Sequence, residues 1–396
     1  MVSAGVAATL LVAGLASLFM AWAIGAGSSG STPFAPAVGA NAIGVMRAGF
    51  VVGILGLLGA TLQGANVTEA VGRELIIGVT LSPAAAVVAL VLAAALVAVG
   101  VFAGYPIATA FTVTGAVVGV GLAAGGQPAW PKYREIAALW LLVPFVGGGI
   151  AYGTARTLRS ERVSERVAVP LLGAVVGLII ANVGFVLLGP TDEAASLTDV
   201  AVRALGGGTI VRAGVTVAAA AIAAGLLALD LRNDETAGQR HFLLVLGGLV
   251  AFSAGGSQVG LALGPLLPIL DGAAPALPLL AVLFGGGLGL LVGSWTGAPR
   301  MIKALSQDYS SLGPRRSIAA LIPSFAIAQS AVFFGVPVSF NEIIVSAIIG
   351  SGYAAGGAGV SREKMLKTVA AWVLSLALAL GLGYGLFSLV ALAGLG

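Results

Sequence analysis

Cysteine is missing from this sequence, histidine occurs once, at His241, and only 9% of the 396 residues are charged. Without cysteine, disulfides, iron–sulfur clusters and thiol catalysis are excluded. With one histidine, neither a histidine-ligated metal site nor a histidine-based catalytic dyad is expected. A soluble domain carries about 25% charged residues, so the shortage of charge excludes an ordinary soluble protein.

Apolar residues make up 59% of the sequence, and the mean hydropathy is +1.08. Runs of about 20 apolar residues cross a bilayer as helices. We therefore expect an all-α, polytopic protein of the cell membrane with about twelve membrane segments. These are predicted at residues 4–24, 46–65, 83–104, 106–124, 136–155, 168–190, 208–230, 242–268, 276–296, 316–335, 338–356 and 368–394.

Basic residues cluster in four short loops between these segments. The clusters are Arg156, Arg159, Arg162 and Arg166; Arg232 and Arg240; Arg300, Lys303, Arg315 and Arg316; and Arg362, Lys364 and Lys367. The positive-inside rule places such loops in the cytoplasm, which leaves both chain ends outside. The net charge of +4 is thus interpreted as a signal of orientation and not of nucleic-acid binding.

The stretch 24–33, with the sequence IGAGSSGSTP, follows the first apolar segment and interrupts its helical pattern. Pro33 and Pro36 forbid an unbroken helix here. Irregular backbone at membrane depth is tolerated where it is buried in protein or lines a cavity. A broken membrane helix also exposes backbone N–H groups, so this stretch is either a binding site or a Ser/Gly loop at the membrane surface.

Two distant parts of the chain share a pattern. Residues 115–126 match residues 346–357 at most positions, and Pro106 and Pro337 precede them at the same distance. An odd number of predicted segments separates the two copies, so they are inverted relative to each other. Inverted repeats with Gly/Pro-interrupted segments are typical of secondary transporters. Chance similarity between glycine-rich helices is the alternative explanation.

The repeat divides the chain into three parts. We assign residues 1–157 to the first inverted repeat and residues 241–396 to the second, with broken helices or re-entrant hairpins near Pro106 and Pro337. Residues 158–240 link the two repeats and hold two predicted spans and a polar cytoplasmic linker, residues 232–240.

Four clusters of polar residues are predicted at breaks in the spans. Hydroxyls, amides and backbone N–H groups at helix starts are neutral donors, suited to a small anion. The predicted anion contacts are Ser28, Ser29, Ser31, Thr109, Ser257, Gln258, Ser339 and Asn341. For Thr112 and Thr114, a hydroxyl that bonds the preceding helical turn explains the residue as well as an anion contact does. No phosphate-binding Walker loop is present, so ATP is not expected as the energy source.

Glu342 is an ionisable residue inside an apolar segment. Such a residue is a functional hypothesis by default, and beside an anion its carboxyl would have to be protonated. We therefore predict that Glu342 couples a proton to transport. The alternative is a glutamate near the membrane surface that pairs with a basic residue.

Over almost its whole length the chain resembles the inorganic phosphate transporter family of anion permeases. The resemblance lies in residues 24–31 and 255–261, which match the family's GANDxxN-type breaks, and in residues 105–110 and 336–341, which match its LPVSTT-like breaks. Residues 64–69 also resemble the segment after the family's second span. The resemblance implies a permease fold with the anion bound between two inverted halves.

The chain departs from the family pattern at both aspartates. The family's Asn–Asp pair falls on Gly27–Ser28 in the first copy and on Ser257–Gln258 in the second. The resemblance therefore does not imply the family's sodium site, and the pattern is closer to the sulfate-permease branch. Sulfate carries no proton and is suited by neutral donors, so we place sulfate ahead of phosphate, although Glu342 can act as an acceptor.

The sequence thus predicts a transporter of a small oxyanion, sulfate before phosphate, with H⁺ a better candidate than Na⁺ for the coupling ion. The alternatives are a phosphate symporter driven by sodium or protons and, in another class, an anion channel. An enzyme is not expected, because no catalytic constellation is visible. We expect no cofactor, no metal and no nucleic-acid partner, and a homodimer is left open.

Overall fold

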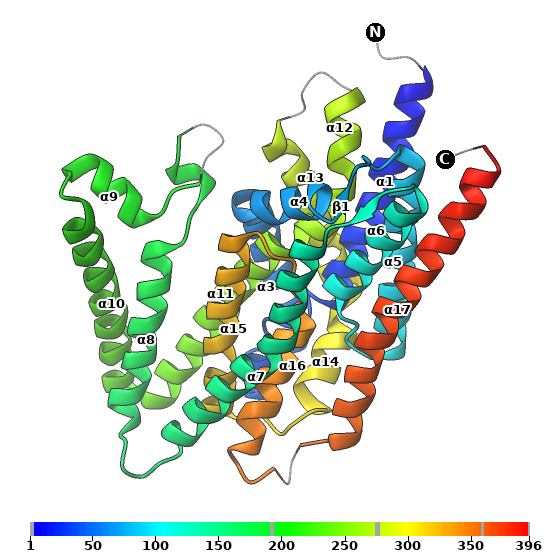
Figure 1. Cartoon of the computed structure of the whole chain (residues 1–396). Helices are drawn as coiled ribbons and strands as arrows, with labels where there is room; N and C mark the ends of the chain where they lie inside the picture. The colour runs from blue at the N-terminus through cyan, green and yellow to red at the C-terminus, as the bar shows by residue number, and fades with distance from the viewer. Residues whose placement is uncertain (1–3, 191–193, 274–277, 358–359, 395–396) are drawn as a thin grey trace.

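A computed structural model describes residues 4–190, 194–273, 278–357 and 360–394, and these residues are mostly helical (Figure 1). Ten described helices are long and apolar enough to cross a membrane. They are α1 (Ala4–Gly27), α3 (Val45–Gln63), α5 (Pro83–Ala103), α7 (Trp130–Leu158), α8 (Glu165–Asn182), α10 (Gly208–Asn233), α11 (Glu235–Leu263), α13 (Leu279–Thr296), α15 (Pro314–Phe334) and α17 (Arg362–Leu392).

Shorter elements lie between these helices. The short α-helices are α2 (Ala35–Gly39), α4 (Ala65–Arg73), α6 (Thr109–Ala123), α9 (Leu197–Leu205), α12 (Leu267–Ala273), α14 (Ala298–Gln307) and α16 (Phe340–Tyr353). Two 3₁₀ turns, η1 (Val186–Leu188) and η2 (Gly264–Leu266), and two strands, β1 (Ile76–Ile77) and β2 (Gln127–Pro128), complete the described elements. Together with α6 and α16, the ten long helices account for the twelve membrane segments expected.

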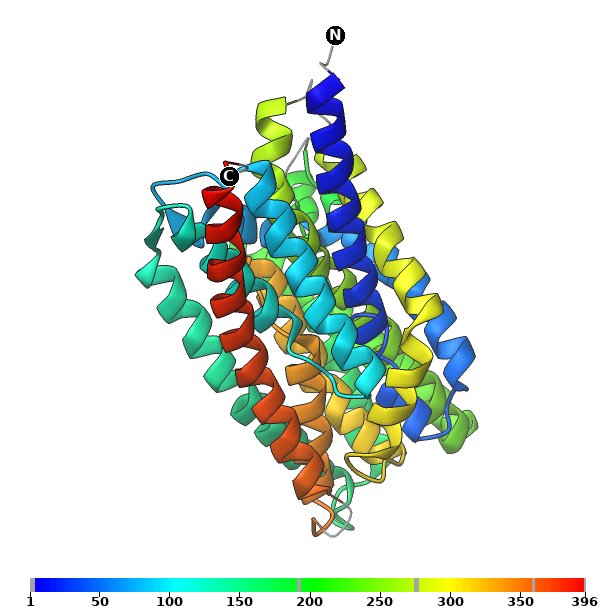
Figure 2. The same cartoon turned by 90° about the vertical axis from the view of Figure 1, so that its right-hand side faces the viewer.

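The basic loops gather at one end of the molecule, the lower end in Figure 1. Ion pairs join them there: Lys364 Nζ lies 3.2 Å from Asp308 Oδ2, and Arg166 pairs with Glu235 at 3.5 Å. The start of α1 and the end of α17 lie at the opposite end (Figures 1 and 2). This arrangement agrees with the orientation that the positive-inside rule predicts.

Helices from the two ends of the chain pack closely against each other. Helix α1 lies between α5 and α13, while α11 lies between α15 and α3. At two of these crossings, α1 with α13 and α11 with α3, a glycine meets backbone: a Cβ on Gly25 would lie 2.2 Å from the carbonyl oxygen of Leu290, and one on Gly255 would lie 2.0 Å from that of Gly56. Small residues allow membrane helices to approach this closely, which explains much of the high glycine content.

Helices α8, α9 and α10 form a group of their own at one side of the molecule (Figure 1). We call this group the bridge, because it joins the first and last parts of the chain. Residues 232–240, predicted as a polar linker, are helical except at Asp234: α10 ends at Asn233 and α11 begins at Glu235. Asp234 makes the short break by accepting hydrogen bonds from the N–H groups of Thr236 and Ala237, as an N-cap does.

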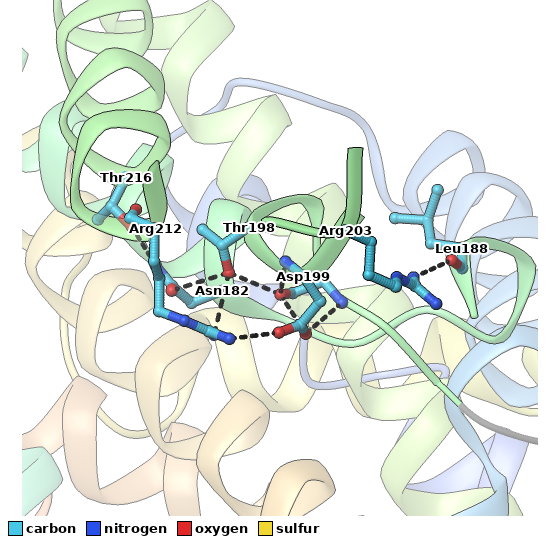
Figure 3. A network of polar contacts seen from close by, with 8 residues as sticks. Asn182, Leu188, Thr198, Asp199, Arg203, Arg212 and Thr216 are labelled. Carbon is cyan, nitrogen blue, oxygen red and sulfur yellow. Dashed lines mark hydrogen bonds and ion pairs between the residues drawn. The ribbon is translucent and has the colours of Figure 1, made fainter. Parts of the chain in front are cut away.

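A polar network ties the three bridge helices together (Figure 3). Arg212 of α10 donates to Asp199 of α9 at 2.6 Å, and Asn182 of α8 donates to Thr216 of α10 at 3.0 Å. Ser196 caps α9 through reciprocal hydrogen bonds with Asp199. These bonds, with a contribution from Arg212, lower the pKa of Asp199 to about 2.

Candidate functional site

Helices α6 and α16 begin in the interior of the protein. Helix α5 is capped at its C-terminus by Gly104, and α15 by Gly335, each with a left-handed backbone conformation (φ 72° and 62°) that favours glycine. The short stretches 105–108 and 336–339 follow without helical structure, and all residues of the first turns of α6 and α16 are buried. Pro106 and Pro337, which cannot continue a helix, account for these predicted breaks.

Asn341 ties the two helix starts together. Its Nδ2 donates to the carbonyl oxygen of Ile107, just before α6, at 2.6 Å, and to that of Gly27, the last residue of α1, at 2.9 Å. The starts of α6 and α16 and the end of α1 therefore meet at one place. The first N–H groups of a helix have no partner within it, so two sets of donors converge here.

Gln258 is the hub of the polar side chains at this place. Its Oε1 accepts hydrogen bonds from Thr109 Oγ1 at 2.7 Å and from Ser28 Oγ at 3.2 Å. Its Nε2 donates to the carbonyl oxygen of Val338 at 2.7 Å. One buried amide thus joins α1, α6, α11 and the stretch before α16.

Several buried polar atoms, on residues that are near Gln258 or its hydrogen-bonded partners in the sequence or that bond to the starts of the helices, have no hydrogen-bond partner among the described residues. They are Ser29 Oγ, Ser257 Oγ, Ser339 Oγ and Asn341 Oδ1. Leaving a buried polar group unpaired costs about 1–3 kcal/mol, and such groups call for an explanation. We use the name central cluster for Ser28, Ser29, Thr109, Ser257, Gln258, Ser339 and Asn341, all of them buried.

Two tryptophans hold the stretches that precede α6 and α16, each from the other part of the chain. Trp140 Nε1 of α7 donates to the carbonyl oxygen of Pro337 at 3.0 Å, and Trp372 Nε1 of α17 donates to that of Pro106 at 2.7 Å. Sequence reasoning missed both tryptophans. The one signal in the sequence was that the two tryptophans are separated by almost the same number of residues as Pro106 and Pro337, which indicates corresponding positions in the two repeats.

The structure corrects one expectation about the breaks. Ser257 and Gln258 do not lie at a break, because α11 runs unbroken from Glu235 to Leu263. The irregular turn comes later, at η2, where Pro265 lies. The glycines around Ser257 serve close packing, as Gly255 against Gly56 shows, so they continue the helix instead of interrupting it.

Other predicted residues have local roles. Ser31 Oγ and Thr32 Oγ1 both donate to the carbonyl oxygen of Ser28 and so hold the turn after α1. Thr112 Oγ1 donates to the carbonyl oxygen of Ala108 at 3.0 Å. This is the bond to the preceding turn that the sequence offered as an alternative to an anion contact. Ser31 is thus buried beside the central cluster with its hydroxyl donated to backbone.

Glu342 is 1% exposed and lies in the first turn of α16. It lines a cavity of about 630 Å³ between α7, α16 and α17, whose lining contains no member of the central cluster. Its Oε2 has no hydrogen-bond partner within the described ranges. The structure therefore places Glu342 next to Asn341 in sequence but facing another space.

The central cluster is a neutral set of donors and acceptors. It combines serine and threonine hydroxyls, two amides and the N-termini of two helices, whose dipoles favour negative charge. Such an arrangement can bind an anion without a cationic side chain.

The sequence profile of the family described as "Phosphate transporter family" matches residues 24–383. The chain belongs to the phosphate transporter family. Its membership agrees with the ten long apolar helices and makes it a multi-pass membrane protein. The resemblance found at residues 24–31 and 336–341 lies within the matched range.

Individual relatives of this family member are distant but cover almost all of it. A protein of Thermococcus kodakarensis, provisionally described as a phosphate permease, is 24% identical over 97% of this chain and 98% of its own length. The chloroplastic inorganic phosphate transporter 2-1 of Arabidopsis thaliana is 23% identical over 91% of this chain and 69% of its own length. Neither is described as a sulfate permease.

A solved structure described as "The sodium-dependent phosphate transporter" shares the fold of this family member. The TM-score is 0.81 at 20% identity, over 97% of this chain and 99% of that chain. The likeness confirms the all-α, polytopic architecture expected from the sequence. At 20% identity, the structural likeness supports the fold and gives no information about the transported ions.

Proposed function

We propose that this protein is a secondary active transporter of a small tetrahedral oxyanion, with phosphate as its substrate. The observation that carries the proposal is the meeting of α6 and α16 by their N-termini, together with buried hydroxyls, on residues next to the hydrogen-bonded ones in the sequence, that no described protein group uses. Half-helix N-termini that point at an anion near the membrane midplane are typical of transporter sites. The family and the descriptions of the relatives support phosphate as the anion.

Asn341 Oδ1 is the feature that favours phosphate over sulfate. Near neutral pH phosphate keeps at least one proton, and that P–OH group needs an acceptor. Asn341 Oδ1 is a buried acceptor without a partner in the described structure. Sulfate remains the second candidate, since the side chains of the central cluster are all uncharged and suit an anion without a proton.

We propose that the chain is built from two inverted halves, residues 1–157 and 241–396, joined by residues 158–240. Matched elements support this division. Helices α5 and α15 have 21 residues each and are followed alike by a capping glycine, Gly104 and Gly335, and α6 and α16 have 15 and 14 residues. Trp140 and Trp372 make reciprocal bonds between the halves, so rocking of one half against the other would move both pairs.

We also propose that Glu342 takes up the proton that drives transport. It is buried and lies one residue from Asn341, so its charge state can affect the start of α16. Ser28 and Gln258 occupy the positions where the resemblance places the family's aspartates, which favours protons over sodium. We expect Glu342→Gln to abolish proton-driven uptake and to retain phosphate exchange. Equal loss of both activities would remove Glu342 from this role.

The experiment that tests the transport proposal is uptake of labelled phosphate and labelled sulfate into proteoliposomes. Proton and sodium gradients are imposed separately, and saturation is measured for each anion. We expect saturable phosphate uptake that follows the proton gradient. Uptake that does not saturate would indicate a channel, and uptake that follows only the sodium gradient would contradict proton coupling.

A further inference from the structure

Helices α7, α16 and α17, with Phe111 of α6, line a cavity of about 630 Å³ whose lining contains no residue of the central cluster. Its outer rim includes Leu141, Phe145 and Val373, whose side chains are 69%, 77% and 60% exposed. In a membrane-spanning bundle such apolar side chains face the acyl chains of the lipid. The cavity is therefore a groove that a molecule dissolved in the bilayer can enter. We call it the α7–α16–α17 groove.

Glu342 is the one ionisable residue among the described residues that line this groove. It is 1% exposed, and its Oε2 has no partner in the described part of the chain. A lone carboxylate in an apolar setting is unstable, so the carboxyl either stays neutral or pairs with a cation. No lysine, arginine or histidine in the described lining supplies that cation.

Three aromatic side chains, Phe111, Trp140 and Trp372, line the same groove. The rings of Phe111 and Trp140 stack with their centroids 3.8 Å apart. Both indole N–H groups are already used, by the carbonyl oxygens of Pro337 and Pro106. The tryptophans therefore offer the groove ring surface and no donor, and aromatic faces attract organic cations.

We propose that the α7–α16–α17 groove is a second binding site, which takes a lipophilic amine: an alkyl chain that carries a basic nitrogen. The chain occupies the apolar lining. The nitrogen accepts the proton from the carboxyl group of Glu342, and the resulting ammonium pairs with the carboxylate beside the aromatic rings. No bond other than this O–H bond is broken.

This inference goes beyond the proposed function, because the ligand is neither the transported anion nor the coupling ion. It is therefore tested without any phosphate or ion gradient. The probe is N,N-dimethyldodecylamine, and the matched control is 1-dodecanol, which has the same chain and no basic nitrogen. The protein is the full wild-type chain in lipid nanodiscs.

The first measurement is protection of Glu342 from dicyclohexylcarbodiimide, an apolar reagent for protonated carboxyl groups, followed by mass spectrometry. We expect the reagent to modify Glu342, and the amine to slow this modification about tenfold more than the alcohol does, the ratio that an ion pair with aromatic contacts provides. Glu363, which is exposed and paired with Lys367, serves as the control carboxyl. As an ionised carboxylate at the surface, it should stay unmodified with either probe.

Two outcomes of this measurement overturn the proposal. Equal protection by amine and alcohol would mean that the groove takes any alkyl chain. Failure of the apolar reagent to modify Glu342 would mean that the carboxyl is closed to the bilayer. Neither outcome bears on phosphate uptake, so a failure here is distinct from a failure of the proposed transport.

Direct binding of the labelled amine to variants gives a second, independent measurement. Glu342→Gln should lower amine binding to the level of dodecanol, and Phe111→Leu should lower it about threefold by removing one aromatic face. Ser346→Ala, at another residue that lines the groove, should leave amine binding unchanged. Retained amine preference in Glu342→Gln would contradict the assignment.

Discussion

The central cluster and the bridge network are both polar, but they are satisfied to different extents. In the bridge, every polar side chain labelled in Figure 3 has a hydrogen-bond partner; Asp199, for example, bonds both Ser196 and Arg212. In the central cluster, Ser29, Ser257 and Ser339 hold hydroxyls without a partner in the described structure. The labelled polar groups of the bridge are therefore satisfied within the protein, while the cluster has hydroxyls that are free to bind a ligand.

The two networks also differ in exposure: the bridge ion pair is partly exposed, and the central cluster is buried. The side chains of Arg212 and Asp199 are 48% and 38% exposed, so water can replace any bond that is lost. The cluster is buried, so a lost partner there is not replaced. Substitutions in the cluster should affect transport strongly, and substitutions in the bridge should affect stability weakly.

The largest effect is expected from Gln258→Leu. This change removes the three hydrogen bonds that Gln258 makes with Ser28 Oγ, Thr109 Oγ1 and the carbonyl oxygen of Val338, and leaves the two hydroxyls only their long contact of 3.5 Å with each other. With about 1–3 kcal/mol for each unpaired buried group, we expect phosphate uptake to fall about a hundredfold or more. Gln329→Leu is the matched control, because Gln329 is a buried amide that bonds Gln63 and Ser253 instead. Equal loss of uptake in both variants would contradict a special role for the cluster.

Ser257→Ala and Ser339→Ala test the hydroxyls without partners. Because no described bond is lost, we expect the melting temperature to stay unchanged. The KM for phosphate should rise about ten- to a hundredfold, as the loss of one hydrogen bond to a charged ligand predicts. Ser324→Ala, which loses a helix-internal bond to Ala320, should leave the KM unchanged. A lower melting temperature with an unchanged KM would make these serines structural.

Trp140→Phe and Trp372→Phe each remove one reciprocal bond between the proposed halves. Each variant loses about 1 kcal/mol, so we expect a few-fold decrease in the maximal uptake rate with little change in KM. The two variants should behave alike if the halves play equal parts. A normal rate in one variant and a large loss in the other would sharpen the comparison by showing that only one tether matters for transport.

The smallest effect is expected from Asp199→Asn in the bridge. Because folding lowers the pKa of Asp199 to about 2 from a usual value of 3.8, its stabilising contribution is present above about pH 4 and is lost as the pH falls towards 2. A partly exposed pair contributes about 1 kcal/mol or less. Melting temperatures of wild type and variant should thus differ slightly at pH 7 and converge near pH 2, with phosphate uptake at pH 7 unchanged. A large loss of uptake would place the bridge in the transport cycle.

The sequence predicted the features that depend on local chemistry. The apolar runs predicted the spans, and Pro106 and Pro337 predicted the breaks before α6 and α16, because proline acts on its own stretch of backbone. It was also possible to name Ser28, Thr109 and Gln258, which the structure brings into direct contact.

Features that depend on distant contacts were beyond sequence reasoning. In the sequence, glycines that end a helix cannot be told from glycines that let it pack closely. For the glycines around Ser257, the contact of Gly255 with Gly56 of α3 shows that they serve close packing. The bonds from Trp140 and Trp372 join residues 197 and 266 positions apart, and local periodicity carries no information about them. The direction in which Glu342 faces was equally hidden, because neighbouring residues of a helix point to different sides.

The glycine contacts between α1 and α13 and between α3 and α11 have a mechanical consequence. Where main chain rests on main chain, as at Gly25 and Gly255, no side chains interlock to resist sliding. A single methyl group added at Gly25 or Gly255 would lie about 2 Å from a carbonyl oxygen of the neighbouring helix, so it would force the two helices apart.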